Sequence, residues 1–76
     1  MSEVVWLNAF GDNLAEMMDE YGISQQELAE ETGLTQSTIS KYLNKTQMPG
    51  LKAIINISYA LNCDLEDLID FGDTID

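Results

Sequence analysis

The chain has 76 residues, of which 45% are hydrophobic, and a formal net charge of −11. This length suits one small domain, and the apolar content is enough for one core, which argues against global disorder. A single cysteine excludes an internal disulfide, the lack of histidine argues against a zinc site, and no apolar run is long enough to cross a membrane. We therefore expect a single domain over residues 1–76 in the reducing cytoplasm, with no cofactor and no metal.

The first expected helix covers about residues 7–21, after a short lead-in from Met1 to Trp6. Apolar residues recur there at three- and four-residue spacing, which predicts an amphipathic helix with one buried face. Gly22 follows and favours a left-handed helix ending. The apolar positions of this helix are Leu7, Phe10, Leu14, Met17, Met18 and Tyr21.

A capping box predicts the start of a second helix. Ser24 and Glu27 have the S-x-x-E spacing, in which each side chain accepts a hydrogen bond from the other residue's backbone N–H. The helix should cover residues 25–32 and bury Leu28. Gly33 should close it in the left-handed conformation.

A third helix is expected over residues 36–43, with Thr35 as its N-cap. Ile39 and Tyr42 form its apolar side, and the short glycine-containing turn before it is typical of a helix-turn-helix. The opposite face carries only hydrogen-bonding residues, which indicates a surface that binds a partner, although a solvated helix face is the alternative. These residues are Gln36, Ser37, Ser40 and Lys41.

The remainder of the chain predicts a loop and two more helices. Residues 44–50 gather Asn, Thr, Pro and Gly, and Pro49 disfavours a helical residue before it. Helices are expected over 51–61 and 65–70, the second capped by Asp64, with an acidic tail over 71–76. Because no segment reads as a strand, we expect an all-α, compact five-helix bundle.

The charges are distributed unevenly along the chain. Residues 1–31 hold eight carboxylates and residues 64–76 hold six, with no Lys or Arg in either segment. The window 32–63 contains no acid and all three lysines, Lys41, Lys45 and Lys52. Proteins that bind DNA neutralise phosphates with basic side chains. The acid-free window is therefore where we expect nucleic-acid contact, in spite of the negative net charge.

A set of residues recurs in order and at a characteristic spacing between Ser24 and Ile69. It comprises Gln25 after the capping serine, Leu28-Ala29, Gly33, Ile39, the loop from Asn44 to Pro49, and Ile57, Leu61 and Leu65. With these residues the segment resembles the Cro and phage-repressor helix-turn-helix family, and the similarity covers about residues 7–69. This resemblance implies a lambda-repressor-like DNA-binding domain whose third helix lies in the major groove of double-stranded DNA.

The resemblance also implies roles for individual residues. Glutamine can hold adenine and lysine can reach guanine in the major groove, so bases should be read by the polar face of the third helix. These base-reading residues are Gln36, Ser37, Ser40 and Lys41. The resemblance implies phosphate contacts at Gln25, Thr35, Asn44 and Lys45. Lys52 is a further expected phosphate contact, and for both lysines an ordinary solvated side chain is the alternative.

The sequence departs from the family at positions that often carry Arg or Lys. On the first helix these positions fall near Asn13, Ala15 and Met18, and on the fourth helix at Asn56 and Tyr59, all of which are uncharged. With at most three or four charged phosphate contacts, one copy should bind DNA weakly and with a shallow salt dependence.

We expect a sequence-specific transcriptional regulator, in particular a repressor from a bacterium, phage or mobile element. Family members read paired half-sites, which implies a homodimer on half-sites roughly 34 Å apart. The apolar residues near the two ends either form a dimer seam or partner patch, or fold back on the core, and these interpretations are equally supported. The end residues in question are Val4, Val5, Trp6, Phe71 and Ile75.

The alternative function is a protein-interaction module on the same fold, such as an antitoxin or antirepressor that binds a protein partner through its acidic surface. An enzyme is not expected, because the carboxylates accompany no histidine and no nucleophile–base pair. Cys63 occupies a position where the family has a small core residue, so we expect a buried structural thiol there.

Overall fold

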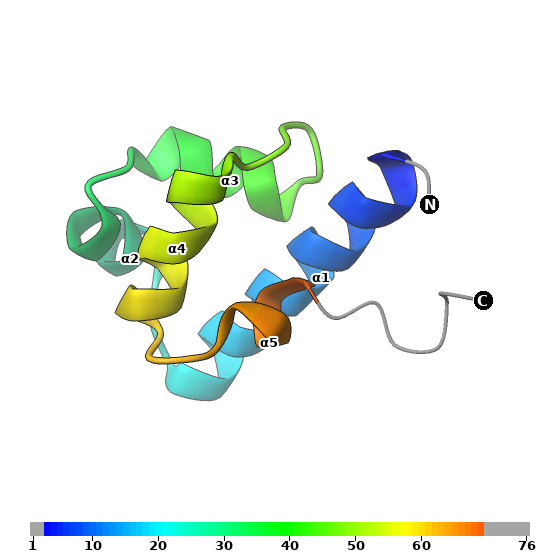
Figure 1. Cartoon of the computed structure of the whole chain (residues 1–76). Coiled ribbons are helices and arrows are strands. Elements are labelled where there is room, and N and C mark those ends of the chain that lie inside the picture. The colour runs from blue at the N-terminus through cyan, green and yellow to red at the C-terminus, as the bar shows by residue number, and fades with distance from the viewer. Residues whose placement is uncertain (1–2, 70–76) are drawn as a thin grey trace.

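A computed structural model describes residues 3–69, with side chains from residue 5 onward, and contains five helices and no strand within that range (Figure 1). The expected all-α, five-helix architecture is confirmed. This description leaves out the side chain of Val4. It also leaves out the acidic tail, with Phe71 and Ile75. The helices are α1 (Glu3–Tyr21), α2 (Gln25–Thr32), α3 (Gln36–Leu43), α4 (Leu51–Ala60) and α5 (Leu65–Ile69).

The start of α1 differs from the expectation. The helix begins at Glu3, four residues before Leu7, so Trp6 belongs to its first turns. The Trp6 ring stacks on Phe10, with ring centroids 5.7 Å apart and planes 9° from parallel. Aromatic side chains four residues apart meet on one helix face, and this contact stabilises the additional turn. Trp6 therefore packs against the core, which is one of the two alternatives expected for the residues near the N-terminus.

Local signals fix the ends of the other helices. α2 and α3 begin and end at the expected residues, and Gly33 closes α2 with a φ of 77°. Gly22 and Asn62 end α1 and α4 in the left-handed region, with φ values of 64° and 51°. The N–H of the residue after each of them donates to a carbonyl five residues back. Ile23 donates to Met18, and Cys63 donates to Ser58. This is the Schellman arrangement, which satisfies carbonyl groups at the end of a helix.

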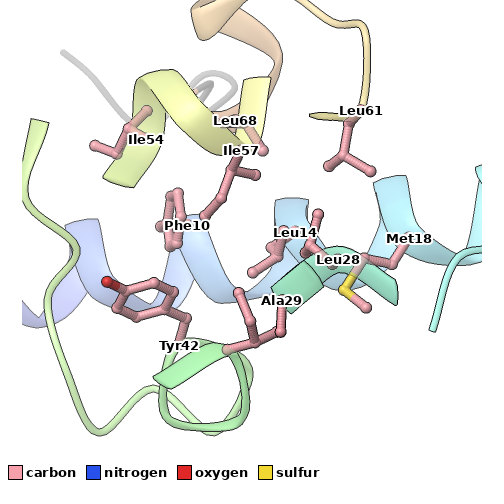
Figure 2. Packing of buried hydrophobic residues seen from close by; sticks show 11 residues of the cluster. Phe10, Leu14, Met18, Leu28, Ala29, Tyr42, Ile54, Ile57, Leu61 and Leu68 are labelled. Atoms are coloured by element: carbon pink, nitrogen blue, oxygen red, sulfur yellow. The ribbon is translucent and has the colours of Figure 1, made fainter. Parts of the chain in front are cut away.

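Every helix contributes at least one side chain that is fully buried. Figure 2 shows the side chains from α1 directed toward those of the other helices. α1 packs against α3 and α5, α2 packs against α3 and α4, and α4 packs against α5. None of the helices within residues 3–69 is long and apolar enough to span a membrane. The largest fully buried residues are Phe10, Leu14, Leu28, Ile39, Ile57 and Leu68.

Two polar contacts inside this bundle restrict how the helices are placed. The Asn13 side-chain amide donates to the Leu68 carbonyl at 2.8 Å and so joins α1 to α5. Thr32 is buried at the end of α2, where its hydroxyl donates to the Leu28 carbonyl at 2.8 Å and accepts from the Leu34 N–H at 3.3 Å. Because the Thr32 hydroxyl both donates and accepts, it fixes the path of the turn between α2 and α3.

Candidate nucleic-acid interface

The N-terminus of α3 is fixed by Thr35, as its sequence predicts. The Thr35 hydroxyl accepts a hydrogen bond from the Thr38 N–H at 3.0 Å and donates to the Thr38 hydroxyl at 2.8 Å. The cap satisfies one of the unpaired N–H groups of the first turn. The Thr35 hydroxyl is therefore already engaged within the protein.

The four residues expected to read bases lie on one side of α3. At about 100° per residue, residues 36, 37, 40 and 41 fall within a sector of about 140°. Gln36, Ser37 and Lys41 are exposed and Ser40 is half-buried. The opposite side holds Ile39 and Tyr42, which are buried in the core. The structure thus brings the predicted polar face together and leaves most of it open to solvent.

Tyr42 packs in the core, as its place on the apolar side of α3 predicts. Only 3% of the residue is exposed. Burial raises the pKa of its hydroxyl above the ordinary value, because the charged form would lose its hydration. The phenol is therefore neutral at physiological pH and serves to anchor α3.

Asn44 and Lys45 lie where α3 ends. Asn44 is the C-cap, and its side-chain amide donates to the Ser40 hydroxyl at 3.3 Å. Lys45 has a φ of 63°, and the next N–H, that of Thr46, bonds to the Lys41 carbonyl at 2.9 Å. This is again a Schellman ending, but a lysine occupies the position that glycine usually takes.

The Lys45 side chain lies against α1. A Cβ added to Gly11 would stand 2.8 Å from the Lys45 Cγ and 2.9 Å from the Tyr42 carbonyl oxygen. Only glycine therefore allows α1 to approach this close to the end of α3. One residue farther along α1, Asp12 Oδ1 lies 2.6 Å from the Lys45 Nζ. The Lys45 ammonium group, which is expected to contact a phosphate, is therefore already paired with a carboxylate.

No feature of the sequence indicated this ion pair, because residues 12 and 45 are far apart in the chain and share no motif. Lys41 and Lys52 are exposed, and within residues 3–69 neither forms an ion pair. Lys52 stands in the first turn of α4, whose N-cap residue Gly50 provides no side-chain hydrogen bond. The positive end of the α4 dipole therefore lies beside a free ammonium group.

Gln25 is the first residue of α2 and is half-buried. The capping box beside it is complete: the Ser24 hydroxyl accepts from the Glu27 N–H at 3.1 Å, and the Ser24 N–H donates to Glu27 Oε1 at 3.2 Å. Gln25 lines a groove of about 520 Å³ between α1 and α2, together with Asp19 and Glu27. Both carboxylates stand near an expected phosphate contact, and that of Asp19, on α1, was not anticipated from the sequence.

The departures on α1 have structural explanations. Asn13 bonds to α5 and Met18 is buried, so at these two positions the side chains serve the core rather than a charged surface. Ala15 is exposed and carries no polar group. Along this part of α1, the charged contact with the end of α3 is made by a carboxylate, that of Asp12.

Cys63 is only half-buried, where a buried structural thiol was expected, and it packs against the edge of the core. It follows the left-handed residue Asn62 and lines a groove with Tyr59 and Leu65. Desolvation raises the pKa of the thiol above its ordinary value, and the negative charges of Asp67 and Asp64 raise it further. The thiol is therefore a poor nucleophile at neutral pH.

A family model of the Cro/C1-type helix-turn-helix DNA-binding domain matches residues 13–73. The chain belongs to the Cro/C1-type helix-turn-helix family. The solved structure of the restriction-modification controller protein C.AhdI from Aeromonas hydrophila has the same fold, with a TM-score of 0.79 and 29% sequence identity. The match covers 82% of this chain and 94% of that chain. No curated protein matches the chain significantly.

Family membership establishes the general activity. A Cro/C1-type domain binds DNA, and this chain is a DNA-binding transcription regulator. The helix-turn-helix is formed by α2, the turn at Gly33 and α3.

Proposed function

We propose that this Cro/C1-type protein represses transcription by occupying an operator in double-stranded DNA, with α3 in the major groove. The polar face of α3 carries the proposal, because it is mostly exposed and contains no carboxylate. Repression needs only occupancy of the operator by the protein. Within residues 3–69 no group of three or more potential ligands is placed to hold a metal. The family match and the controller protein that shares the fold support a regulatory role in a bacterium, phage or mobile element.

The proposed division of roles follows from where each side chain stands. Gln36, Ser37, Ser40 and Lys41 read base edges, because they share the outward face of α3. Gln25, Asn44 and Lys52 contact phosphates from the ends of three helices. Thr35 and Lys45 belong to the same proposed set. Like the Asn44 amide, which donates to the Ser40 hydroxyl, the Thr35 hydroxyl and the Lys45 ammonium have partners within the protein.

We propose further that the protein acts as a homodimer on half-sites roughly 34 Å apart. The expected seam at the N-terminus loses support, because Trp6 packs against the core. An apolar stripe on α4 supports a different surface. Leu51 and Tyr59 are 70% and 80% exposed, and half-buried Ile55 lies between them at four-residue spacing. A second copy covering this stripe would also double the few phosphate contacts.

The direct test is selection of binding sites from random double-stranded DNA at two salt concentrations. We expect enrichment of a two-fold symmetric sequence, with weaker binding at the higher salt. Recovery of no preferred sequence at either salt concentration would contradict operator recognition.

The second candidate function is binding of a basic protein partner, as an antitoxin or antirepressor would do. The exposed carboxylates of α2 favour it: Glu27, Glu30 and Glu31 stand on a helix that has no basic residue. It would replace the first proposal if Gln36→Ala and Lys41→Ala left all binding unchanged while Glu30→Gln abolished capture of the partner. A cytoplasmic location, expected from the single cysteine, belongs to both proposals.

A further inference from the structure

We propose that Asp12 sets an upper limit on the DNA affinity of this protein by neutralising Lys45. This inference rests on the proposed function, because it takes Lys45 as a phosphate contact. It adds a role for α1, which the sequence showed only as an acidic helix without the basic residues common in the family. The role is to pair with one of the three lysines and so make it less available to a phosphate.

The geometry of the pair is specific. Asp12 Oδ1 lies 2.6 Å from Lys45 Nζ. Within residues 3–69 this is the only ion pair. The Lys45 side chain is 34% exposed and that of Asp12 is 68% exposed. The pair therefore stands at the surface, where a phosphate can compete with the carboxylate for the same ammonium group.

Two adjacent residues of α1 contact the lysine. Gly11 leaves space for its stem, since a Cβ there would meet the Lys45 Cγ at 2.8 Å and Cε at 3.2 Å. Asp12 then binds the ammonium. Gly11 thus makes room for the methylene groups of Lys45, and Asp12 binds its ammonium group. Together these two consecutive residues direct the lysine side chain along α1.

The backbone of Lys45 indicates that its side chain is needed. Its φ of 63° belongs to the left-handed region, which glycine adopts without strain and lysine does not. Asn62 and Gly22, which end the other two helices in the same way, are residue types that tolerate this region. A strained lysine at such a position points to a contact made by the ammonium.

Neutralisation by Asp12 reduces the salt-dependent part of DNA binding. A free lysine that meets a phosphate releases one counterion from DNA, and the entropy of that release favours binding. A lysine paired with a carboxylate brings no net charge, so a phosphate must displace Asp12 or approach a negative group. The wild-type protein therefore has two free lysines, Lys41 and Lys52, where three stand in the sequence.

The test compares Asp12→Asn with a matched control, Glu16→Gln, on the selected DNA site. Glu16 is exposed on the next turn of α1 and belongs to no ion pair within residues 3–69. Both variants remove one negative charge, so the control measures the long-range effect alone. We expect Asp12→Asn to bind DNA about 1.4- to fivefold more tightly than Glu16→Gln, the range that corresponds to an exposed ion pair. The slope of log K against log salt should steepen by up to about 0.9.

The double variant Asp12→Asn/Lys45→Gln separates the inference from the proposed function. If the inference is right, this variant loses the gain in affinity and the gain in slope. If Asp12→Asn matches Glu16→Gln while the double variant binds more weakly than Asp12→Asn, Lys45 contacts phosphate but Asp12 does not limit it, and the inference is wrong. If adding Lys45→Gln changes nothing, Lys45 is no phosphate contact, and both that assignment and the inference fail.

Thermal unfolding distinguishes the proposed role from a purely structural one. If the ion pair only stabilised the fold, Asp12→Asn would lower Tm and weaken DNA binding together. The proposal expects tighter binding even where Tm falls. A wild-type protein that binds no DNA at low salt would overturn the proposed function itself, before any of these variants is compared.

Discussion

The ring of Phe10 on α1 meets the ring of Tyr42 on α3 edge-on, with centroids 5.8 Å apart and ring planes at 85°. Phe10 is fully buried, and Trp6 stacks on it along α1 (Figure 2 shows Phe10 beside Tyr42). Edge-to-face aromatic pairs add directional attraction to the burial of their area. Because α3 packs only against α1 and α2 among the described helices, this pair helps to set the angle at which the polar face of α3 is presented.

Removing the Phe10 ring should therefore destabilise the whole domain. We expect Phe10→Ala to lower the free energy of unfolding by about 3–5 kcal/mol, measured by urea denaturation followed by far-UV circular dichroism. A small domain has about 5–15 kcal/mol in total, so the variant should be partly unfolded. Val5→Ala on the same helix is the control, since Val5 is 41% exposed. A loss as small as that of the control would contradict this account of the core.

Base readers and phosphate contacts should respond differently to substitution. Gln36→Ala is expected to cost roughly 1–3 kcal/mol of binding free energy and to relax preference at one base pair. Lys52→Ala should weaken binding to all sequences alike and reduce the salt slope by about 1. Both effects are measured by fluorescence polarisation on the selected site and its single-base variants. Identical behaviour of the two variants would show that the proposed division of roles is wrong.

Replacement of Lys45 should separate stability from binding. Lys45→Gly removes left-handed strain of about 1–2 kcal/mol. It also loses an exposed ion pair of about 0.2–1 kcal/mol and adds chain entropy of about 0.5–1 kcal/mol. The free energy of unfolding should therefore stay within about 1 kcal/mol of the wild type. Lys45→Ala keeps the strain and should be the less stable variant in urea denaturation. The reverse order would mean that the left-handed backbone at residue 45 carries little strain.

The proposed dimer surface can be tested with two exposed tyrosines. Tyr59 lies on the apolar stripe of α4, and Tyr21, which is 51% exposed, ends α1. Tyr59→Glu places a charge in the proposed interface and should give monomers in sedimentation at concentrations where the wild type is dimeric. Tyr21→Glu adds the same charge elsewhere and should leave the dimer intact. Monomeric wild-type protein at high micromolar concentration, with and without DNA, would exclude the dimer.

Cys63 predicts a pH dependence whose sign is fixed by its surroundings. Its pKa is raised in the folded state, first by desolvation and then by Asp67 and Asp64, so the folded protein holds the thiol proton more tightly than the unfolded chain does. The stability from this group is fully present below the ordinary thiol pKa and is lost as the pH rises through the raised value. Alkylation at pH 8 should be slower in the folded protein than in urea. Asp67→Asn should speed it, and an unchanged rate would exclude the contribution of that carboxylate.

The parts of the structure that the sequence predicts are those determined by nearby residues. The bounds of α2 and α3 follow from Ser24, Gly33 and Thr35, whose hydrogen bonds and φ values involve neighbours within four residues. The start of α1 lies four residues before the predicted one, because Trp6 stacks on Phe10 and continues the helical pattern toward the N-terminus.

The parts that escaped prediction depend on contacts between distant segments. The pairing of Lys45 with Asp12 requires α1 to pass close to the end of α3. Gly11 permits this approach, but the two segments meet only once the chain has folded. The half-buried state of Cys63 likewise depends on how the turn after α4 lies against the neighbouring helices. The roles of the individual base-reading and phosphate-contacting residues stay predictions.

The acidic segments on both sides of the acid-free window, residues 32–63, affect how the protein is distributed over DNA in a cell. Binding to arbitrary DNA is almost entirely electrostatic, and a genome offers about 10⁶–10⁹ such competing sites. A strongly basic regulator spends most of its time on these sites. A chain with a net charge of −11 and three lysines is retained by them far less. The unbound pool then follows copy number closely, so if the proposed operator recognition holds, operator occupancy should respond directly to synthesis and dilution of the protein.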